Sequence, residues 1–222
     1  CKVFDTGSSG ASSPVLLNGA AGSGRTRKLA FRAGKRALDI LLSVSLLPVL
    51  VLIAVALLIL NPFYNRGPLF FVQTRMGRYC IPFRAIKFRT MTGIPEMARS
   101  AECPLEVDRI TRLGRFLRQS RLDELPQILN VLRGEMSLIG PRPDYYDHAL
   151  HFMQSVPGYR NRHMVRPGIS GLAQTEVGYA AGTEQTRRKV QADLYYMANT
   201  GIRMELWLIW RTLSVVIRRK GS

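Results

Sequence analysis

Two adjacent carboxylates, Asp123 and Glu124, stand just before Pro126 in the stretch SRLDELPQILNVLRG. The chain contains 15 acidic residues against 32 Lys and Arg, so two acids side by side are an unusual use of a scarce residue type. Apolar residues then recur at helical spacing and predict a helix from about Pro126 to Gly134: Leu125, Ile128, Leu129 and Leu132. The acids therefore lie at the N-terminal end of a predicted helix.

The residues before these acids allow three interpretations, one of which is phosphate chemistry. Four arginines precede them: Arg112, Arg115, Arg118 and Arg121. Arginines hold phosphate oxygens, and carboxylates bind Mg²⁺ that bridges phosphates. One carboxylate could also act as a nucleophile and form an acyl phosphate, with the other as base or metal ligand. Helix capping by one acid, or a structural salt-bridge network, uses the same residue types, so all three interpretations stay open.

Two turn-rich segments downstream present further polar side chains. In IGPRPD, Arg142 lies between Pro141 and Pro143, which restrict the backbone on both sides of it. In VRPGISGLAQ, Arg166 precedes a Pro-Gly turn and Gln174 ends the segment. These loops are either rigid turns or a ligand site built from loops, where a guanidinium meets a phosphate or a base.

A third basic element is KFRTM, which begins at Lys87. If this segment is a strand, Lys87 and Arg89 lie on one face and Phe88 lies on the other. The alternation is typical of a half-buried strand that shows its basic face either to a ligand or to water. We therefore include Lys87 and Arg89 as candidate phosphate-binding residues, with an ordinary basic edge strand as the alternative.

The longest apolar segment, Ile40–Leu60, contains 21 residues without a charge. As a helix it would be about 31 Å long, enough to cross a bilayer core. Basic residues flank it on both sides, which places both ends in the cytosol by the positive-inside tendency. Pro48 breaks the backbone hydrogen bonding, so we predict a re-entrant membrane hairpin over residues 28–65 rather than a full span or a buried core helix. Asp39 would be held at the interface by the neighbouring Lys35 or Arg36.

The rest of the chain divides into a leader and one domain. Residues 1–27 are rich in Gly and Ser and predict a flexible leader. Residues 66–222 predict a domain of short strands followed by helices, with two helices meeting near Ser120–Asp123. The last helix carries Trp207 and Trp210 and resembles an amphipathic helix at a membrane interface, although a plain core helix fits nearly as well.

The charge of the chain limits its partners. A formal net charge of +17 favours an anionic partner, such as nucleic acid, phospholipid head groups or a phosphorylated substrate. A nucleic-acid-binding protein explains this charge but neither the apolar segment nor the paired acids, since phosphate-backbone binders usually exclude carboxylates. A non-catalytic basic membrane scaffold explains the apolar segment and leaves the acids as a cap.

Taken together, these motifs resemble the monotopic phosphoglycosyl transferases, a bacterial sugar transferase family. The resemblance runs from about Lys35 to Lys220 and covers the Pro-broken apolar segment followed by KFRTM, RLGRFLRQSRLDELPQILNVLRGEMSLIGPRPD, RPGISGLAQ and DLYY. It implies transfer of a sugar 1-phosphate from a UDP-sugar to a polyprenyl phosphate, such as undecaprenyl phosphate, with release of UMP. It also implies a largely helical α/β domain at the cytoplasmic face of the bacterial inner membrane, where anionic lipid would meet the basic surface.

The resemblance assigns roles to matching residues. Asp123 would be the nucleophile that carries the phosphosugar, Glu124 would assist as base or metal partner, and Mg²⁺ would neutralise the diphosphate. Arg118 matches a phosphate-holding arginine, and Pro141-Arg142-Pro143 matches a nucleotide-sugar motif. The sequence leaves open which sugar is used, which acid ligates the metal, and whether a homodimer forms.

Overall fold

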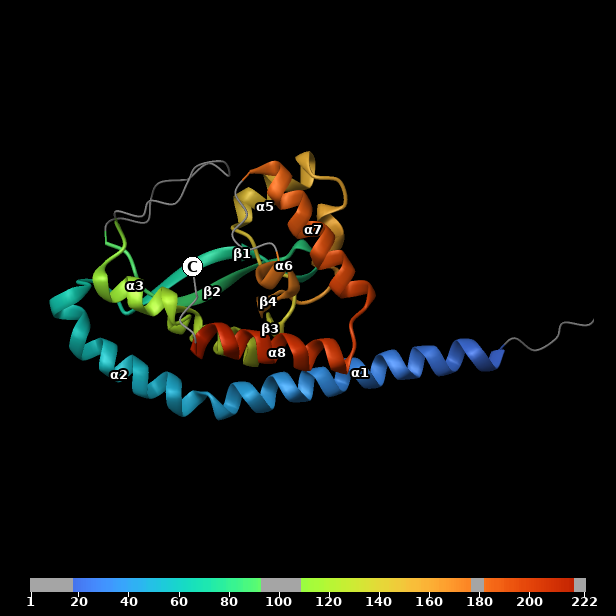
Figure 1. Ribbon diagram of the computed structural model, residues 1–222, viewed down its shortest axis with the longest axis horizontal. Helices are drawn as coiled ribbons and strands as arrows, with labels where there is room; N and C mark the ends of the chain where they lie inside the picture. Colours follow the sequence, from blue (N-terminus) through green and yellow to red (C-terminus); the bar gives the residue numbers. More distant parts are fainter. Residues whose placement is uncertain (1–17, 93–108, 177–181, 218–222) are drawn as a thin grey trace, which may run out of the picture.

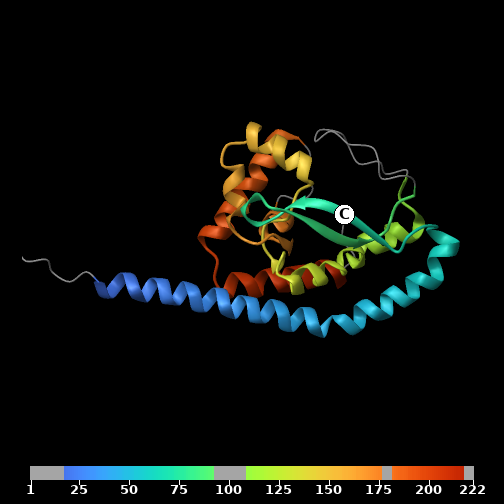
Figure 2. The ribbon, with the colours of Figure 1, turned by 180° about the vertical axis from the view of Figure 1, so that it is seen from behind.

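The computed structural model describes residues 18–92, 109–176 and 182–217, with side chains from Leu29 to Ser214 inside those ranges. Two long N-terminal helices run along one edge of the molecule, and the remaining elements form a domain on one side of them (Figures 1 and 2). The described part is mostly helical with short strands, which confirms the predicted largely helical character.

The apolar N-terminal segment forms two helices, α1 (Asn18–Ser45) and α2 (Leu47–Tyr64). The helix is interrupted at Leu46, slightly earlier than Pro48 itself, because Pro48 lies in the first turn of α2, where a missing N–H group costs nothing. Helix α1 already begins within the stretch predicted to be a leader. Figure 1 shows α2 bending away from the line of α1 toward the domain.

Helix α2 buries one narrow face and exposes most of its other side chains. Leu50, Leu57 and Asn61 are buried, and the two leucines share a cluster with Phe88 and Leu117 of the domain. Leu47, Ile53 and Ala54 are partly buried against the same cluster. The exposed apolar side chains of α2 include Val49, Val51, Leu52, Val55, Leu58, Ile59, Leu60 and Phe63. With 18 residues, α2 is the one helix in the described ranges that is long and apolar enough to cross a membrane. An exposed apolar surface this large is typical of a membrane or protein interaction site.

Helix α1 is attached to the domain through polar contacts. Lys35 forms an ion pair with Glu205 at 2.5 Å, and Arg36 donates to the carbonyl of Val131 at 2.7 Å. The Asp39 carboxylate accepts from the backbone N–H of Leu138 at 3.1 Å. The expectation that Lys35 or Arg36 holds Asp39 was therefore wrong, because tertiary contacts provide closer partners for all three side chains.

A β-hairpin lies at the centre of the domain. Strands β1 (Phe70–Met76) and β2 (Pro82–Phe88) pair antiparallel, joined by the one-turn 3-10 helix η1 (Arg78–Cys80). Burial alternates along β2 from Pro82 to Ala85, as expected for a half-buried strand, and Phe88 is buried on the other face. Lys87 shares the face of Phe83 and Ala85, opposite Phe88.

The segment that carries the acidic pair follows as helix α3 (Arg112–Gln119), the 3-10 turn η3 (Leu122–Glu124) and helix α4 (Gln127–Arg133). This arrangement confirms two helices meeting near Ser120–Asp123. Gly134, with a φ of 85°, ends α4 as predicted, because glycine adopts this left-handed conformation without steric cost.

The C-terminal half packs around a short parallel pair, β3 (Ser137–Ile139) with β4 (Gly168–Ser170). Its helical elements are α5 (Tyr146–Ser155), η4 (Tyr159–Met164), α6 (Leu172–Glu176), α7 (Thr183–Ala198) and α8 (Ile202–Ile217). Helix α8 buries Leu208 and Glu205 inward and exposes apolar residues that recur at helical spacing: Ile202, Leu206, Trp210 and Leu213. In both ribbon views α8 lies beside α1, to which the Lys35–Glu205 ion pair joins it (Figures 1 and 2).

Candidate active site

The acidic pair lies on η3, which packs between α3 and β2. Asp123 is only 8% exposed and Glu124 only 4% exposed. No side-chain hydrogen bond caps the start of α4, where Pro126 takes the cap position. Capping therefore does not explain the pair, and two buried carboxylates need charged partners to offset their desolvation.

Glu124 has those partners. Lys87 donates to its Oε1 at 2.7 Å, and Arg142 donates to its Oε2 at 3.0 Å and also contacts Oε1. Arg121 lies 3.8 Å from Oε2. Burial alone would raise the pKa of Glu124, but the charges and hydrogen bonds of Arg142 and Lys87 hold this pKa well below its usual value. Glu124 is thus an anion whose two oxygens are both occupied.

Asp123 contrasts with its neighbour. In the described ranges, no residue donates a hydrogen bond to its carboxylate or forms an ion pair with it. Burial and the adjacent charge of Glu124 raise the pKa of Asp123, against the opposing effect of Lys87 and Arg142. An unoccupied carboxylate beside cations, with a raised pKa, is suited to nucleophilic attack on a phosphorus atom.

Lys87 is the third titratable group of the site. Burial lowers its pKa to about 8, because the charge of Glu124 only partly compensates for lost hydration. Lys87 is the second-last residue of β2, next to the buried Phe88. The predicted basic face of KFRTM therefore includes a lysine directed at the acidic pair.

The loop that presents Arg142 is held from behind by charged residues that the sequence did not indicate. Arg162 donates to the Arg142 carbonyl at 2.7 Å, and Arg75 donates to the Pro143 carbonyl at 2.7 Å. Arg162 is itself buried and forms ion pairs with Asp144 and with Asp193, the pair with Asp193 at 2.7 Å. Nothing in the local pattern around Arg162 or Asp193 signals this role, because the contacts join segments distant in sequence.

Arg118 and Arg89 meet at the segment that follows β2. Arg118 donates from Nε to the Thr90 hydroxyl at 3.0 Å and from Nη2 to the Met91 sulfur at 3.1 Å. Arg89 donates to the Met91 carbonyl at 2.9 Å. Arg118 also lies near enough to Asp123 to lower its pKa. These two arginines extend the positive region that begins at Lys87.

The other loop candidates do not contact the acids. Arg166 donates to the Gly134 carbonyl at 2.8 Å, at the far end of α4 from Glu124. Gln174 lies on α6, where its Oε1 is buried without a hydrogen-bond partner in the described structure. A role for Arg166 and Gln174 in binding the nucleotide sugar stays a prediction.

The donor set of the site fits Mg²⁺ through one carboxylate. The described residues contain no group of three or more His, Cys, Asp or Glu that could hold a metal. Mg²⁺ is usually bound by one or two carboxylates together with substrate phosphates and water, so such a group is not required. Asp123 has free oxygens, whereas both oxygens of Glu124 are engaged by cations. Asp123 is therefore the better candidate ligand.

Comparison with known proteins identifies the family to which this chain belongs. The profile of the family described as bacterial sugar transferase matches residues 30–219. The chain belongs to the bacterial sugar transferase family. Relatives of this sugar transferase are described in several bacteria. A UDP-N-acetylgalactosamine-undecaprenyl-phosphate N-acetylgalactosaminephosphotransferase of Aeromonas hydrophila is 39% identical over 85% of the chain. A UDP-glucose:undecaprenyl-phosphate glucose-1-phosphate transferase of Caulobacter vibrioides is 40% identical, also over 85% of the chain.

An exopolysaccharide production protein of Rhizobium leguminosarum is 41% identical over 84% of this sugar transferase. The matched regions cover different shares of the relatives' own lengths. They amount to 44% of the Aeromonas protein, 68% of the Caulobacter protein and 97% of the Rhizobium protein. The bacterial sugar transferase family thus includes members of about this chain's extent and members about twice as long.

Proposed function

We propose that this chain transfers a sugar 1-phosphate from a UDP-sugar to a polyprenyl phosphate and releases UMP, through a covalent phosphosugar on Asp123. The observation that carries the proposal is the asymmetry of the acidic pair. Glu124 is neutralised by Lys87 and Arg142, whereas the adjacent Asp123 carboxylate has no hydrogen-bond partner among the described residues. The named activities of the Aeromonas and Caulobacter relatives support the same reaction class.

In the first step, a carboxylate oxygen of Asp123 attacks the phosphorus that bears the sugar. A P–O bond forms to Asp123, and the bond between this phosphorus and the oxygen bridging to UMP breaks. The electron pair of that bond leaves with UMP. The site supplies positive charge from Lys87, Arg142 and Arg118, and fixed charges aimed at developing negative charge are often the largest contribution to catalysis.

Mg²⁺, held by Asp123 and the substrate phosphates, would neutralise negative charge on the diphosphate when bound. Glu124 has a different role in this proposal. It keeps the cationic side chains of Lys87 and Arg142 in place beside Asp123, because both cations contact its carboxylate. Arg142 is therefore positioned to reach the diphosphate as soon as the nucleotide sugar enters.

In the second step, a phosphate oxygen of the polyprenyl phosphate attacks the same phosphorus. The bond to Asp123 breaks, its carboxylate is restored, and a polyprenyl diphosphate sugar leaves. Division of the reaction into two steps lets a soluble donor depart before a lipid acceptor uses the same catalytic groups.

The membrane arrangement belongs to the same proposal. Both α2 and α8 expose apolar side chains, and interruption of the helix at Leu46 suits a re-entrant hairpin. Such a hairpin would place the domain at the cytoplasmic face of the inner membrane. Surplus Lys and Arg would bind anionic lipid, each worth about 1 kcal/mol near the surface.

The test is a UMP-release assay with a panel of UDP-sugars, undecaprenyl phosphate and Mg²⁺. We expect turnover with at least one UDP-sugar, and a stable mass increase equal to the sugar phosphate on Asp123 when the acceptor is omitted. Chelation of divalent cations should stop turnover. UMP release that persists at the wild-type rate in the Asp123→Ala variant would refute the mechanism, and absence of turnover with every donor would refute the function.

A further inference from the structure

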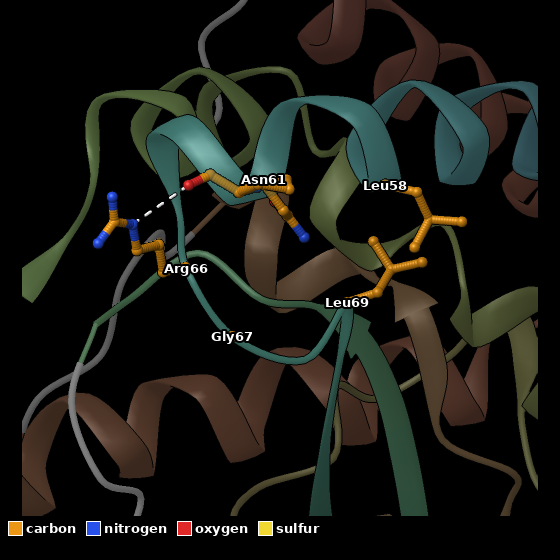
Figure 3. A pocket seen from close by; sticks show the side chains of 6 residues that line it. Leu58, Asn61, Arg66, Gly67 and Leu69 are labelled. Carbon is orange, nitrogen blue, oxygen red and sulfur yellow. Dashed lines mark hydrogen bonds between the residues drawn. The ribbon is translucent and has the colours of Figure 1, made fainter.

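A cavity of about 420 Å³ lies at the C-terminal end of α2, separate from the carboxylate pair. It is open to solvent and lies between the last turns of α2 and the turn that leads into β1 (Figure 3). Its lining combines apolar and polar side chains: Leu58, Asn61, Pro62, Arg66, Gly67 and Leu69. The mechanism described above uses none of these residues.

Two polar side chains in the lining have unused hydrogen-bonding capacity. Asn61 is 6% exposed, and among the described residues its Nδ2 group donates to no acceptor. Figure 3 shows its amide directed into the space between α2 and the Gly67–Leu69 turn. Arg66 donates from Nε to the Pro62 carbonyl at 3.3 Å, which leaves the outer edge of its guanidinium facing outward. The Asn61 Nδ2 group and the Arg66 guanidinium, both in the lining, are hydrogen-bond donors, which favours a ligand with acceptor oxygens.

Gly67 lines this cavity and lies against Arg89, the residue that follows strand β2. The Gly67 φ of +135° favours glycine, and the Arg89 guanidinium lies so close to the turn that an added Cβ would be 2.1 Å from its Nη1. Arg89 follows Lys87 by two residues, and two residues of extended chain span about 7 Å. Lys87 contacts Glu124. The positively charged side chains of Arg89 and Lys87 therefore lie between the cavity and the carboxylate pair.

The other side of the cavity is apolar. Leu58 is 59% exposed and belongs to the exposed face of α2. Leu69 packs against the domain core from the opposite wall. A ligand that satisfies both sides has an anionic head for Arg66 and Asn61 and an apolar chain that extends along α2 into lipid.

We propose that this cavity is the docking site for the acceptor lipid, an isoprenoid phosphate. The phosphate binds Arg66 and the Asn61 amide, and the first isoprene units lie between Leu58 and Leu69. Arg89 lies between this position and Lys87, on the way to Asp123. The proposal rests on the proposed sugar-phosphate transfer and adds the place where the second substrate enters, away from the Arg142 loop assigned to the nucleotide.

The experiment is steady-state kinetics in a non-ionic detergent, with undecaprenyl phosphate as the varied substrate. Asn61→Leu removes the amide with little change of size, and Arg66→Gln removes an exposed charge. Each variant should raise the KM for undecaprenyl phosphate about tenfold, the factor expected for losing one hydrogen bond to a charged group. The KM for the UDP-sugar and the amount of covalent phosphosugar formed without acceptor should stay unchanged. Arg203→Gln, at an exposed arginine of α8, is the matched control.

The outcomes separate this inference from the function on which it rests. Wild-type protein that transfers no sugar phosphate refutes the proposed function. Active wild-type protein with an unchanged acceptor KM in both variants overturns the docking site alone. An unchanged acceptor KM together with weaker binding to phosphatidylglycerol vesicles would identify an ordinary phospholipid as the occupant and would also overturn the proposal. If Asn61→Leu fails to fold, Arg66→Gln still decides the question, because its side chain is exposed.

Discussion

Glu124 and Arg142 meet across a separation of 18 residues, with Nη1 of Arg142 donating to Oε2 of Glu124 at 3.0 Å. The contact joins the 3-10 turn after α3 to the proline-framed loop after β3. Lys87 donates to the other carboxylate oxygen, so three segments converge on one acid. This convergence explains how a chain with few acids uses two of them together. One acid organises the cations, and the other is left available beside them.

Replacement of Arg142 should separate these effects. Arg142→Gln removes the charge that pairs with Glu124 and that we expect to face the diphosphate. We expect kcat to fall about a hundredfold or more, the usual cost of removing one preorganised group that stabilises developing charge. The measurement is UMP release at saturating donor. Arg84→Gln, at an exposed arginine of β2, should keep full activity, and equal loss in both variants would contradict the assignment.

Asp123→Asn should abolish turnover without lowering stability. The residue is buried, lacks a hydrogen-bond donor among its described neighbours and lies beside the anionic Glu124, so a neutral isostere relieves repulsion. We expect activity to fall about ten-thousandfold and the free energy of unfolding in urea to stay equal or rise. A helix-capping role predicts the opposite, a stability loss of about 1 kcal/mol with activity retained.

The pH dependence of kcat/KM should report Lys87. Its pKa is lowered to about 8, so the free enzyme loses this positive charge as the pH rises through that value. Turnover at limiting donor should therefore decline above about pH 8. Lys87→Arg keeps the charge at all accessible pH values and should move the decline to higher pH, even if kcat is lower. A decline at the same pH in this variant would assign it to another group.

The charge network behind the Arg142 loop should be costly to disturb. Asp193, only 1% exposed, pairs with the buried Arg162, which in turn holds the Arg142 carbonyl. Asp193→Asn should lower the free energy of unfolding by about 3 kcal/mol, because it removes one partner of a buried pair. The matched control on the same helix is Glu184→Gln, whose pair with Arg187 is exposed and should contribute less than about 1 kcal/mol. Urea unfolding curves measure both.

The path of the N-terminal helices can be tested by cysteine labelling. Leu29 is 57% exposed on α1, and Phe63 is 77% exposed at the end of α2. With Cys1, Cys80 and Cys103 changed to serine, single cysteines at these two positions should both react with an impermeant reagent from the cytosolic side only. Reaction of the two positions from opposite sides would show a full span instead of a re-entrant hairpin.

Features of this protein that depend on neighbours along the chain could be predicted from the amino-acid sequence. Helical spacing after Pro126, the glycine at 134 and the alternation in KFRTM all predict local structure, because each follows from backbone geometry within a few residues. The same reasoning found the acidic pair and the apolar segment. It placed the helix break at Pro48, whereas the interruption is at Leu46, since a proline is accommodated in the first turn of a helix.

Which charged side chains contact one another depends on the tertiary fold and could not be predicted from the sequence. Of the basic candidates, Lys87 and Arg142 contact Glu124, while Arg166 is held at the opposite end of α4. Arg162 and Asp193, which steady the Arg142 loop, carried no local signal. Electrostatic pairing depends on distance in space and on burial, and packing sets both after the elements have formed. The residue types therefore predicted phosphate chemistry. The tertiary contacts determine that Glu124 is paired with cations, whereas Asp123 has no hydrogen-bond partner among the described residues.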